Sequence, residues 1–185
     1  ESNGGKTYTY TLREGVQWSD GEPLTAEDVV YTINRSRDEE WLNHYSTVQN
    51  LTAKAIDERT VELTSSVPDP KLPVMDVYIL PKHVWEKLDA KAITKAPGTD
   101  GVGSGPFTLT SAKRGESWSM VASPNYLGEK PAIDEVVFRF FSNGDAMVAA
   151  LKTGEVDAAY NFPSQAFEDL SNTENVVALQ GEQGG

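Results

Sequence analysis

The sequence predicts a mixed α/β fold, and three features of its 185 residues lead to that prediction. Thr and Tyr alternate near the start, and both residues favour strands. Apolar residues then recur at helical spacing, which indicates a helix with one buried face. The second half alternates strand-like and helix-like segments. Hydrophobic residues make up 38% and charged residues 24%, which is the composition of a globular protein with a core.

The first two elements have clear boundaries. Residues 6–12 (KTYTYTL) predict a strand with aromatic rings on one face and hydroxyls on the other. Thr25 predicts the N-cap of a helix, because its hydroxyl can accept a hydrogen bond from an amide of the first turn. The pattern of this helix fades near Arg37. Its apolar stripe consists of Ala26, Val29, Val30 and Ile33.

Two short strands and a second helix come next. Residues 51–56 and 60–63 are strand-like, and the turn-forming residues 57–59 between them predict a hairpin. Pro81 predicts the first turn of a helix over 82–88, where its missing amide costs little.

The segment 91–105 is rich in Gly, Pro, Thr and Ser, and it predicts a boundary between two domains. We expect one domain before this segment and a second after it. The strands expected at the start of the second domain are 107–111, 118–122 and 133–141, and the first two form a hairpin.

The last quarter predicts an alternating series. Gly154 predicts the C-terminal cap of one helix, and Ser164 the N-cap of another. The expected elements are a helix over 146–152, a strand over 156–160, a helix over 164–170 and a strand over 176–179. This order favours parallel pairing of the strands.

Charge and cysteine content exclude several classes of function. The chain carries 16 Lys and Arg against 28 Asp and Glu, a net charge of −12, so a nucleic-acid backbone would repel it. No apolar run reaches the roughly 18 residues that a membrane span needs. Without cysteine, disulfides, thiolate zinc sites and a cysteine nucleophile are impossible. His44 and His83 lack the spacing of a metal pair, so we expect no metal site.

Catalytic motifs are weak. The glycines at 101, 103 and 105 resemble a dinucleotide loop only in part, because Pro106 and a strand follow where a helix should begin. No serine nucleophile elbow is present. Carboxylates that could form an acid–base pair stand at turns, helix starts and strand edges, where such groups usually cap or face solvent. They are Asp20, Asp28, Asp134, Glu155 and Asp157.

Two aromatic segments are candidates for binding. Trp41 and Tyr45 flank His44, and they predict either an exposed rim or a surface that stacks on a ligand. Residues 160–162 (Tyr-Asn-Phe) follow an expected strand, and ligands of open α/β sheets bind at such strand ends. The Asn amide can pair with a peptide backbone, and the rings offer flat apolar contact. The residues alone leave open whether these rings bind a ligand or belong to the core.

Four segments in order resemble the family 5 extracellular solute-binding proteins, the peptide- and nickel-binding receptors of ABC importers. The signature region of that family resembles YTYTLREGVQWSDGEPLTAEDVVYTINR at residues 8–35. The other three segments are VGSGPFTL at 102–109, SPNYLGEKPAIDEVVFRFF at 123–141 and ALKTGEVDAAYN at 150–161.

The resemblance implies a periplasmic-binding-protein-like class II fold with mixed sheets, in which two lobes close over a ligand. Residues 1–100 would be an extra α+β subdomain, and residues 101–185 part of the first, ligand-binding lobe. The chain would then be a fragment without the second lobe. Gly103, Gly105 and Pro106 would be architectural and turn the chain from the subdomain into the lobe.

The resemblance also implies the site. In oligopeptide-binding members the segment after the Gly-Glu-x-Asp motif lies at the ligand cleft, which corresponds here to Tyr160, Asn161 and Phe162. Some members carry an aromatic contact after the first helix, and Trp41 or Tyr45 is the nearest candidate.

The implied function is capture without chemistry. The receptor would take peptides between its lobes and deliver them to an ABC permease, with no catalytic residue, metal or cofactor. We expect a monomer that is extracellular or periplasmic and tethered to the membrane as a lipoprotein. Oligosaccharides, which stack on aromatic rings, and chelated nickel are alternative ligands. A carboxylate-dependent hydrolase and a purely structural surface module are alternatives from other classes.

Overall fold

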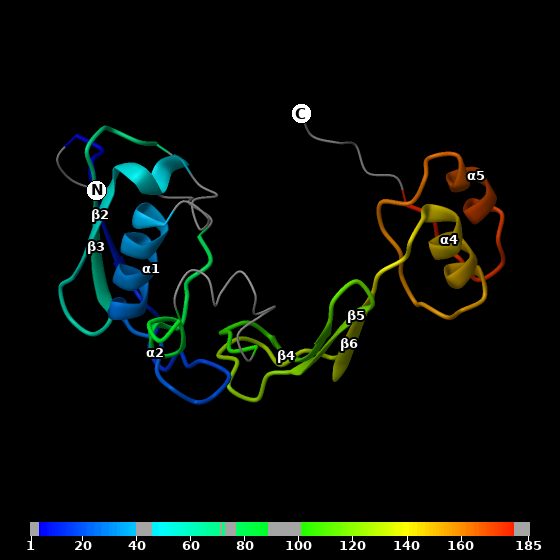
Figure 1. The fold of residues 1–185 in the computed structure, drawn as a ribbon, viewed down its shortest axis with the longest axis horizontal. Coiled ribbons are helices and arrows are strands. Elements are labelled where there is room, and N and C mark those ends of the chain that lie inside the picture. The colour runs from blue at the N-terminus through cyan, green and yellow to red at the C-terminus, as the bar shows by residue number, and fades with distance from the viewer. Residues whose placement is uncertain (1–3, 40–45, 71, 73–76, 89–100, 180–185) are drawn as a thin grey trace. The chain divides into compact units, whose positions relative to one another are not determined.

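The computed structural model describes residues 4–39, 46–70, 72, 77–88 and 101–179 (Figure 1). In chain order its elements are β1 (Thr7–Thr11), α1 (Ala26–Asp38), the 3-10 helix η2 (Ser46–Asn50), β2 (Leu51–Ala55), β3 (Thr60–Ser65), α2 (Lys82–Trp85), β4 (Phe107–Lys113), β5 (Ser117–Ala122), β6 (Glu135–Arg139), α4 (Gly144–Lys152) and α5 (Ala166–Ser171). Helices and two three-stranded sheets confirm the predicted mixed α/β class.

The chain divides into two compact units, which are described separately. The first comprises residues 1–114 and 118–137, and the second comprises residues 115–117 and 138–185. This division concerns compactness, so the expected subdomain and lobe, 1–100 and 101–185, stay a prediction.

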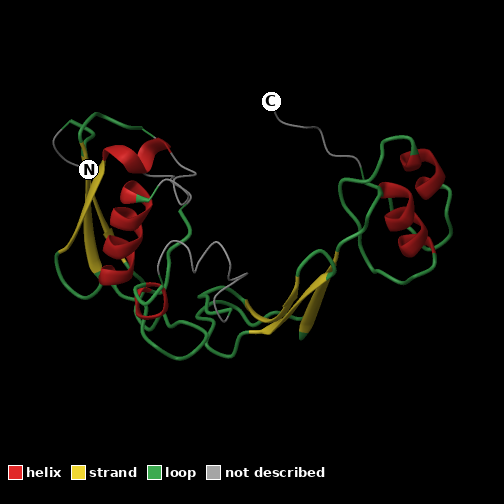
Figure 2. Ribbon diagram, in the orientation of Figure 1, coloured by secondary structure: helices red, strands yellow, loops and turns green. Residues whose placement is uncertain are grey.

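An antiparallel sheet in the order β1–β3–β2 forms the base of the first unit (Figure 2). Val61 of β3 lies opposite Tyr10 on one side and Ala55 on the other. α1 packs on β2 and β3, and the side chains of Ile33, Leu51 and Val61 are at most 1% exposed. Burying each of them contributes about 1.5–3 kcal/mol. The strand, helix and hairpin predicted for this region are confirmed.

A buried carboxylate organises the start of α1. Thr25 is the N-cap, as predicted. Asp28, 5% exposed, accepts hydrogen bonds from the backbone N–H of Thr25 at 2.8 Å and from that of Lys82 at 2.9 Å. One turn later, the Thr32 hydroxyl accepts from the N–H of Leu80 at 2.8 Å. These bonds fix residues 80–82 against α1, and they confirm that Asp28 has a capping role.

Arg35 holds the other end of the same segment. Its guanidinium, 10% exposed, donates to the backbone carbonyls of Trp85 and Leu88. Burial alone would lower the pKa of Arg35, but hydrogen bonds and charge from Tyr31 and Glu39 outweigh burial and raise it. The guanidinium therefore stays charged beside the carbonyls of Trp85, the last residue of α2, and of Leu88. The helix predicted over 82–88 is shorter than expected, because α2 ends at Trp85. The carbonyls of Trp85 and Leu88 accept hydrogen bonds from Arg35.

The turn at residues 18–22 joins distant parts of the first unit. Ser19 donates its N–H to the carbonyl of Gly103 at 2.8 Å, and the N–H of Gly103 donates to the Ser19 hydroxyl at 3.2 Å. The side-chain amide of Asn125 donates to the Ser19 carbonyl at 3.1 Å. Trp18, 1% exposed, lies buried beside them. Three of the segments that resemble the family thus contact one another.

A tight glycine turn precedes β4. Gly101 has a φ of +67°, and a Cβ at this position would lie 2.3 Å from the carbonyl oxygen of Leu109. A side chain here would therefore collide with the backbone and strain the turn. Gly103 and Gly105 have free space around them, so the backbone bonds of Gly103, not its small size, place it.

The second sheet has the order β4–β5–β6. The N–H of Ala122 donates to the carbonyl of Asp134, and the N–H of Phe140 donates to that of Glu116. The end of β5 therefore lies beside the start of β6, so the two strands are antiparallel. The three strands confirm the predicted hairpin and the strand expected after it.

Helices α4 and α5 belong to the second unit. Asn143 caps α4 by accepting from the N–H of Ala146 at 2.9 Å. Gly154, with a φ of +71°, follows the last turn and confirms the predicted C-terminal cap. The N-cap predicted for α5 is wrong, because the helix begins at Ala166 with Gln165 as its cap, not Ser164.

The strands predicted over 156–160 and 176–179 are also wrong, because both segments lack strand structure. A strand needs a neighbour for its backbone groups, and no described strand lies along either segment. The N–H groups of Glu155 and Val156 instead donate to the carbonyl of Ala150 at the end of α4. Val177 and Leu179 are each 83% exposed. The expected parallel series is therefore not formed among the described residues.

Replacing Asp28 with Ala should destabilise the protein by about 2–4 kcal/mol, since two buried N–H groups lose their acceptor. Asp28→Asn should cost less, because one oxygen remains. Urea denaturation measures both effects. Glu27→Gln is the matched control, since Glu27 pairs with Lys82 at the surface and its loss should cost at most about 1 kcal/mol. A cost for Asp28→Ala no greater than that of the control would contradict the capping role.

Gly101→Ala should destabilise the protein by about 1–3 kcal/mol, because Ala strains a left-handed backbone and meets Leu109. Gly103→Ala should be nearly neutral, since its Cβ would meet nothing within 4 Å. Thermal unfolding of the two variants side by side gives the comparison. Equal melting temperatures would show that the turn tolerates a side chain.

Candidate functional site

Residues 160–162 lie between α4 and α5 in the second unit. Tyr160 is 74% exposed, Asn161 is exposed and Phe162 is half-buried. Asn161 has a φ of +57°, a left-handed conformation that non-glycine residues seldom adopt. Asn is one of the few residues that tolerate it. The segment therefore makes a sharp turn that presents its first two side chains to solvent.

The two helices hold this turn on both sides. A Cβ on Gly144 would lie 2.5 Å from the ring of Pro163, so the chain after Phe162 is packed closely on the start of α4. The carbonyl of Pro163 accepts from the N–H of Ala166 and begins α5. Before the turn, the capped end of α4 fixes residues 154–156. The aromatic turn thus rests on a folded support.

The exposed groups of the turn suit recognition. Within the described part of the chain, neither the Asn161 amide nor the Tyr160 hydroxyl makes a hydrogen bond. The amide offers two donors and one acceptor, and the tyrosine adds a flat apolar ring with a polar tip. Neutral groups of this kind can pair with a polar ligand, but they do not transfer protons readily near neutral pH.

The other predicted residues fall into two groups. Trp41 and Tyr45, together with His44, lie outside the described residues, so their role stays a prediction. Three of the candidate carboxylates have structural partners: Asp28 caps α1, Asp20 contacts His83 at 2.8 Å and Glu155 pairs with Arg139 at 2.5 Å. Tyr160 and Asn161 are not joined by any of these groups.

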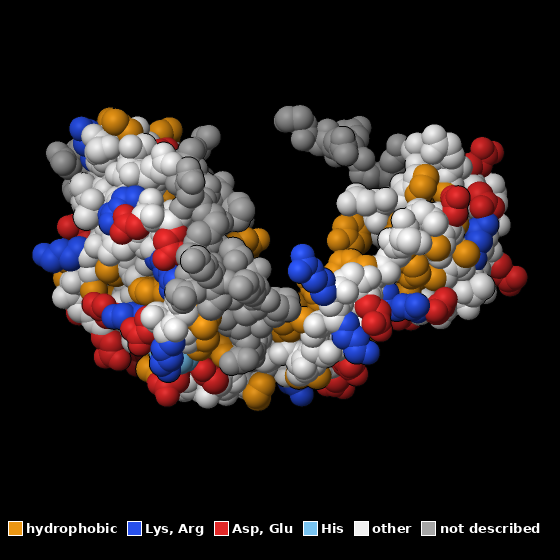
Figure 3. All heavy atoms as spheres, viewed as in Figure 1, with side chains coloured by type: hydrophobic (Ala, Val, Ile, Leu, Met, Phe, Trp, Pro, Cys, Tyr) orange, Lys and Arg blue, Asp and Glu red, His pale blue; other side chains and the backbone are white. Residues whose placement is uncertain are grey.

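Metal and membrane features are absent from the part of the chain that the structure describes. No cluster there brings together three or more His, Asp or Glu side chains. None of the described helices combines the length and the apolar character needed to cross a bilayer. On the face that Figure 3 shows, acidic and basic side chains are interspersed.

One cavity of the first unit was not predicted from the sequence. A cavity of about 520 Å³ lies along the outer side of α1 and beside α2 in the first unit. Tyr31, Asn34 and Arg35 line it from α1, Lys82 lines it from α2, and Glu86 lines it from the position just after α2. Ion pairs occupy its rim, Lys82 with Glu27 at 3.1 Å and Arg35 with Glu39 at 2.9 Å. The spacing of polar residues on α1 could have indicated this face, but α2 adjoins it only through tertiary packing.

Known proteins resemble this chain in sequence, and solved structures among them resemble it in fold. Protein XP55 of Streptomyces lividans is 36% identical over 88% of this chain, which spans 30% of that protein. The ABC transporter substrate-binding protein CtaP of Listeria monocytogenes is 32% identical, with a TM-score of 0.71 over 84% of this chain and 33% of that one. The chain thus spans about a third of the length of these relatives.

A third relative carries a ligand. The periplasmic oligopeptide-binding protein of an ABC transporter from Thermotoga maritima, solved with mannohexaose bound, is 30% identical, with a TM-score of 0.71. The similarity covers 84% of this chain and 30% of that one. Its fold and that of CtaP support the expected periplasmic-binding-protein-like class II architecture.

The sequence profile described as bacterial extracellular solute-binding proteins, family 5 Middle, matches residues 1–185. The match spans every segment that carried the resemblance, including the turn at residues 160–162. The chain belongs to the bacterial extracellular solute-binding proteins of family 5.

Proposed function

We propose that the full-length protein is the substrate-binding receptor of an ABC importer and captures peptides between two lobes. It then delivers them to a membrane permease. The observation that carries the peptide assignment is the exposed turn at residues 160–162, whose amide and phenol make no hydrogen bond to the described residues and stand on a folded support. Membership of an extracellular solute-binding family supports a location outside the cytoplasmic membrane. A lipoprotein tether and a monomeric state complete the proposal.

Binding follows from the chemistry of the turn. The Asn161 amide accepts from a peptide N–H and donates to a peptide carbonyl, so it recognises the backbone and not a particular side chain. The Tyr160 ring covers apolar parts of the ligand. Closure of a second lobe expels water, and each hydrogen bond then acts in a medium of lower dielectric constant. Such a site holds peptides of varied sequence without reacting with them.

Oligosaccharides are the second candidate class, and a specific observation favours them. The Thermotoga maritima relative is named as oligopeptide-binding and was solved with mannohexaose. An exposed ring such as Tyr160 can stack on a sugar face, and the Asn161 amide can pair with hydroxyls. Peptides remain the first choice, because the alternation of donor and acceptor in an amide matches a peptide backbone directly.

The receptor should carry out no chemistry on its ligand. Incubation of the full-length protein with peptides and with chromogenic glycosides is expected to yield no product, since three of the five candidate carboxylates, Asp20, Asp28 and Glu155, serve as caps or ion-pair partners. Chromatography of the mixtures measures this. Turnover that disappears on substitution of a single carboxylate would instead establish the hydrolase alternative.

Asn161→Gly tests the site in the full-length receptor. Gly accepts the left-handed backbone without strain, so the variant removes the amide alone, which Asn161→Ala would not. Affinity for peptide should fall by about 1–3 kcal/mol, because a buried ligand group loses its partner. Calorimetric titration with mixed peptides and, separately, with mannohexaose measures the loss and identifies the ligand class.

Asn175→Gly is the matched control. Asn175 is also exposed and left-handed, with a φ of +63°, and it lies in the same unit. Its replacement should leave affinity unchanged. If both variants bind like the unmodified protein, Asn161 is not part of the ligand site.

A further inference from the structure

Asp20 and His83 form a contact that the proposed function does not use. The Nε2 atom of His83 lies 2.8 Å from Oδ2 of Asp20, and both side chains are about one-third exposed, at 34% and 33%. The other carboxylate oxygen of Asp20 accepts from the N–H of Glu22 at 3.2 Å. The carboxylate is therefore held by its own turn and by a histidine that lies 63 residues further along the chain.

The turn that carries Asp20 is a firm anchor. Its neighbour Ser19 is bonded through backbone and side chain to Gly103, and Asn125 donates to the same residue. Two adjacent residues of one turn thus hold two distant points of the chain. Asp20 holds His83, at the start of α2, and Ser19 holds Gly103, where the chain enters the second sheet.

We propose that the Asp20–His83 pair is a pH-sensitive latch that ties α2 to the turn at residues 18–22. A neutral imidazole donates one ordinary hydrogen bond to a carboxylate, whereas a protonated imidazole donates a charge-assisted bond that is about twice as strong. Histidine ordinarily titrates near pH 6.5, so mild acidification tightens the latch. Stronger acid releases it, because Asp20 then loses its charge.

The titration of Asp20 sets the acid limit. Burial would raise the pKa of Asp20, but hydrogen bonds from His83 and from the Glu22 backbone, with the charge of His83, outweigh burial and lower it from the ordinary 3.8. A carboxyl group whose pKa is lower in the folded protein stabilises the fold when the pH is above its pKa in the unfolded chain. This stabilisation is lost as the pH falls through its pKa in the folded protein. The stabilisation that Asp20 supplies is therefore complete above the ordinary carboxyl value of 3.8 and is lost as the pH falls below it.

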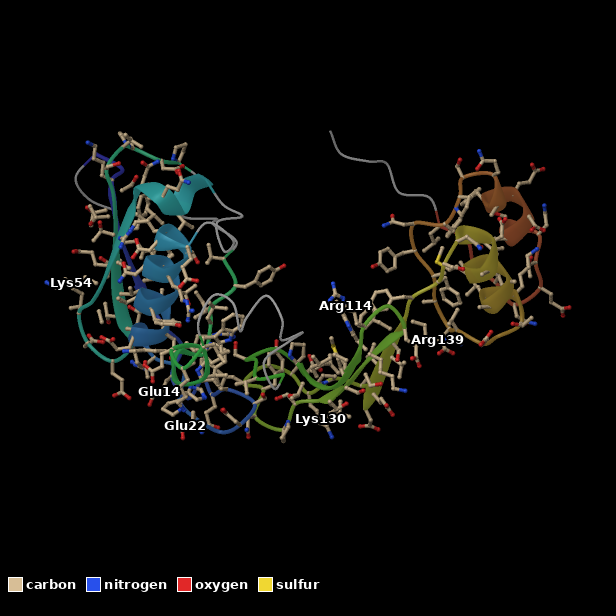
Figure 4. The ribbon with its side chains drawn as sticks, viewed as in Figure 1. Glu14, Glu22, Lys54, Arg114, Lys130 and Arg139 are labelled. Carbon is tan, nitrogen blue, oxygen red and sulfur yellow. The ribbon has the colours of Figure 1, made fainter. Side chains whose placement is uncertain are left out.

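Other charges near the pair leave this assignment intact. Lys82 of α2 is engaged with Glu27 at 3.1 Å. Glu22 of the turn points to solvent (Figure 4), and Glu86 and Lys87, which follow α2, are exposed. Among the described residues, none of these groups forms an ion pair with His83 or Asp20. The pair itself is the titrating contact between the two elements.

Hydrogen exchange of the full-length protein tests the latch. The amides of Trp85, Glu86 and Leu88 donate to backbone carbonyls within this segment, and they report on its opening. After correction for intrinsic exchange, their protection should be several-fold to about tenfold greater at pH 5.5 than at pH 8, the ratio for about 1.4 kcal/mol. Asp20→Asn and His83→Gln should each abolish this difference, because the first removes the carboxylate that a charged imidazole would pair with and the second removes the imidazole.

Glu22→Gln is the control, since it removes a carboxylate from the same turn without touching the pair. It should keep the full pH difference. Equal protection of the unmodified protein at both pH values would overturn the proposal. A difference that persists in both Asp20→Asn and His83→Gln would overturn it too, because another group would then be responsible.

Discussion

The buried carboxylate of Asp28 is the interaction on which the first unit depends. It satisfies the N–H of Thr25 at the start of α1 and the N–H of Lys82 at the start of α2 with separate oxygens. An uncapped helix start would leave amides without partners, and a buried amide without a partner costs as much as a lost hydrogen bond. One side chain thus accepts hydrogen bonds at the starts of two helices, and Asp28 and Lys82 lie 54 residues apart in sequence. The packing of α1 on β2 and β3, and the position of His83 beside Asp20, follow from this placement.

Sequence reasoning succeeded where structure is set locally. The Thr–Tyr alternation of β1, the apolar stripe of α1 and the turn residues between β2 and β3 each act over a few neighbours. The capping of α1 by Asp28 could be predicted, because a carboxylate near a helix start is a familiar cap. Its bond to Lys82 was not visible, since only tertiary packing brings that amide to it. The same reason hides the contact of Ser19 with Gly103.

The two strands that were predicted but not formed show where reasoning from local sequence fails. Residues 176–179 have β-forming side chains, yet a strand is a property of two segments that pair. At residues 156–160 another acceptor also competes with strand pairing, because the carbonyl of Ala150 accepts from the N–H groups of Glu155 and Val156. The site prediction rested on that strand, whose end should have carried Tyr160, Asn161 and Phe162. The structure replaces the strand end with a turn between α4 and α5, and this turn exposes the first two of these side chains all the same.

The backbone of that turn explains why an asparagine suits position 161. A left-handed φ of +57° restricts the residue to Gly, Asn or Asp with little strain. Gly would meet the backbone requirement but offer a ligand no side chain. Asp would meet it too, but as a carboxylate it accepts hydrogen bonds without donating any, and it would add to a net charge of −12. Asn alone combines the turn with a neutral group that both donates and accepts, which is what a peptide backbone requires from a partner that must ignore its side chains.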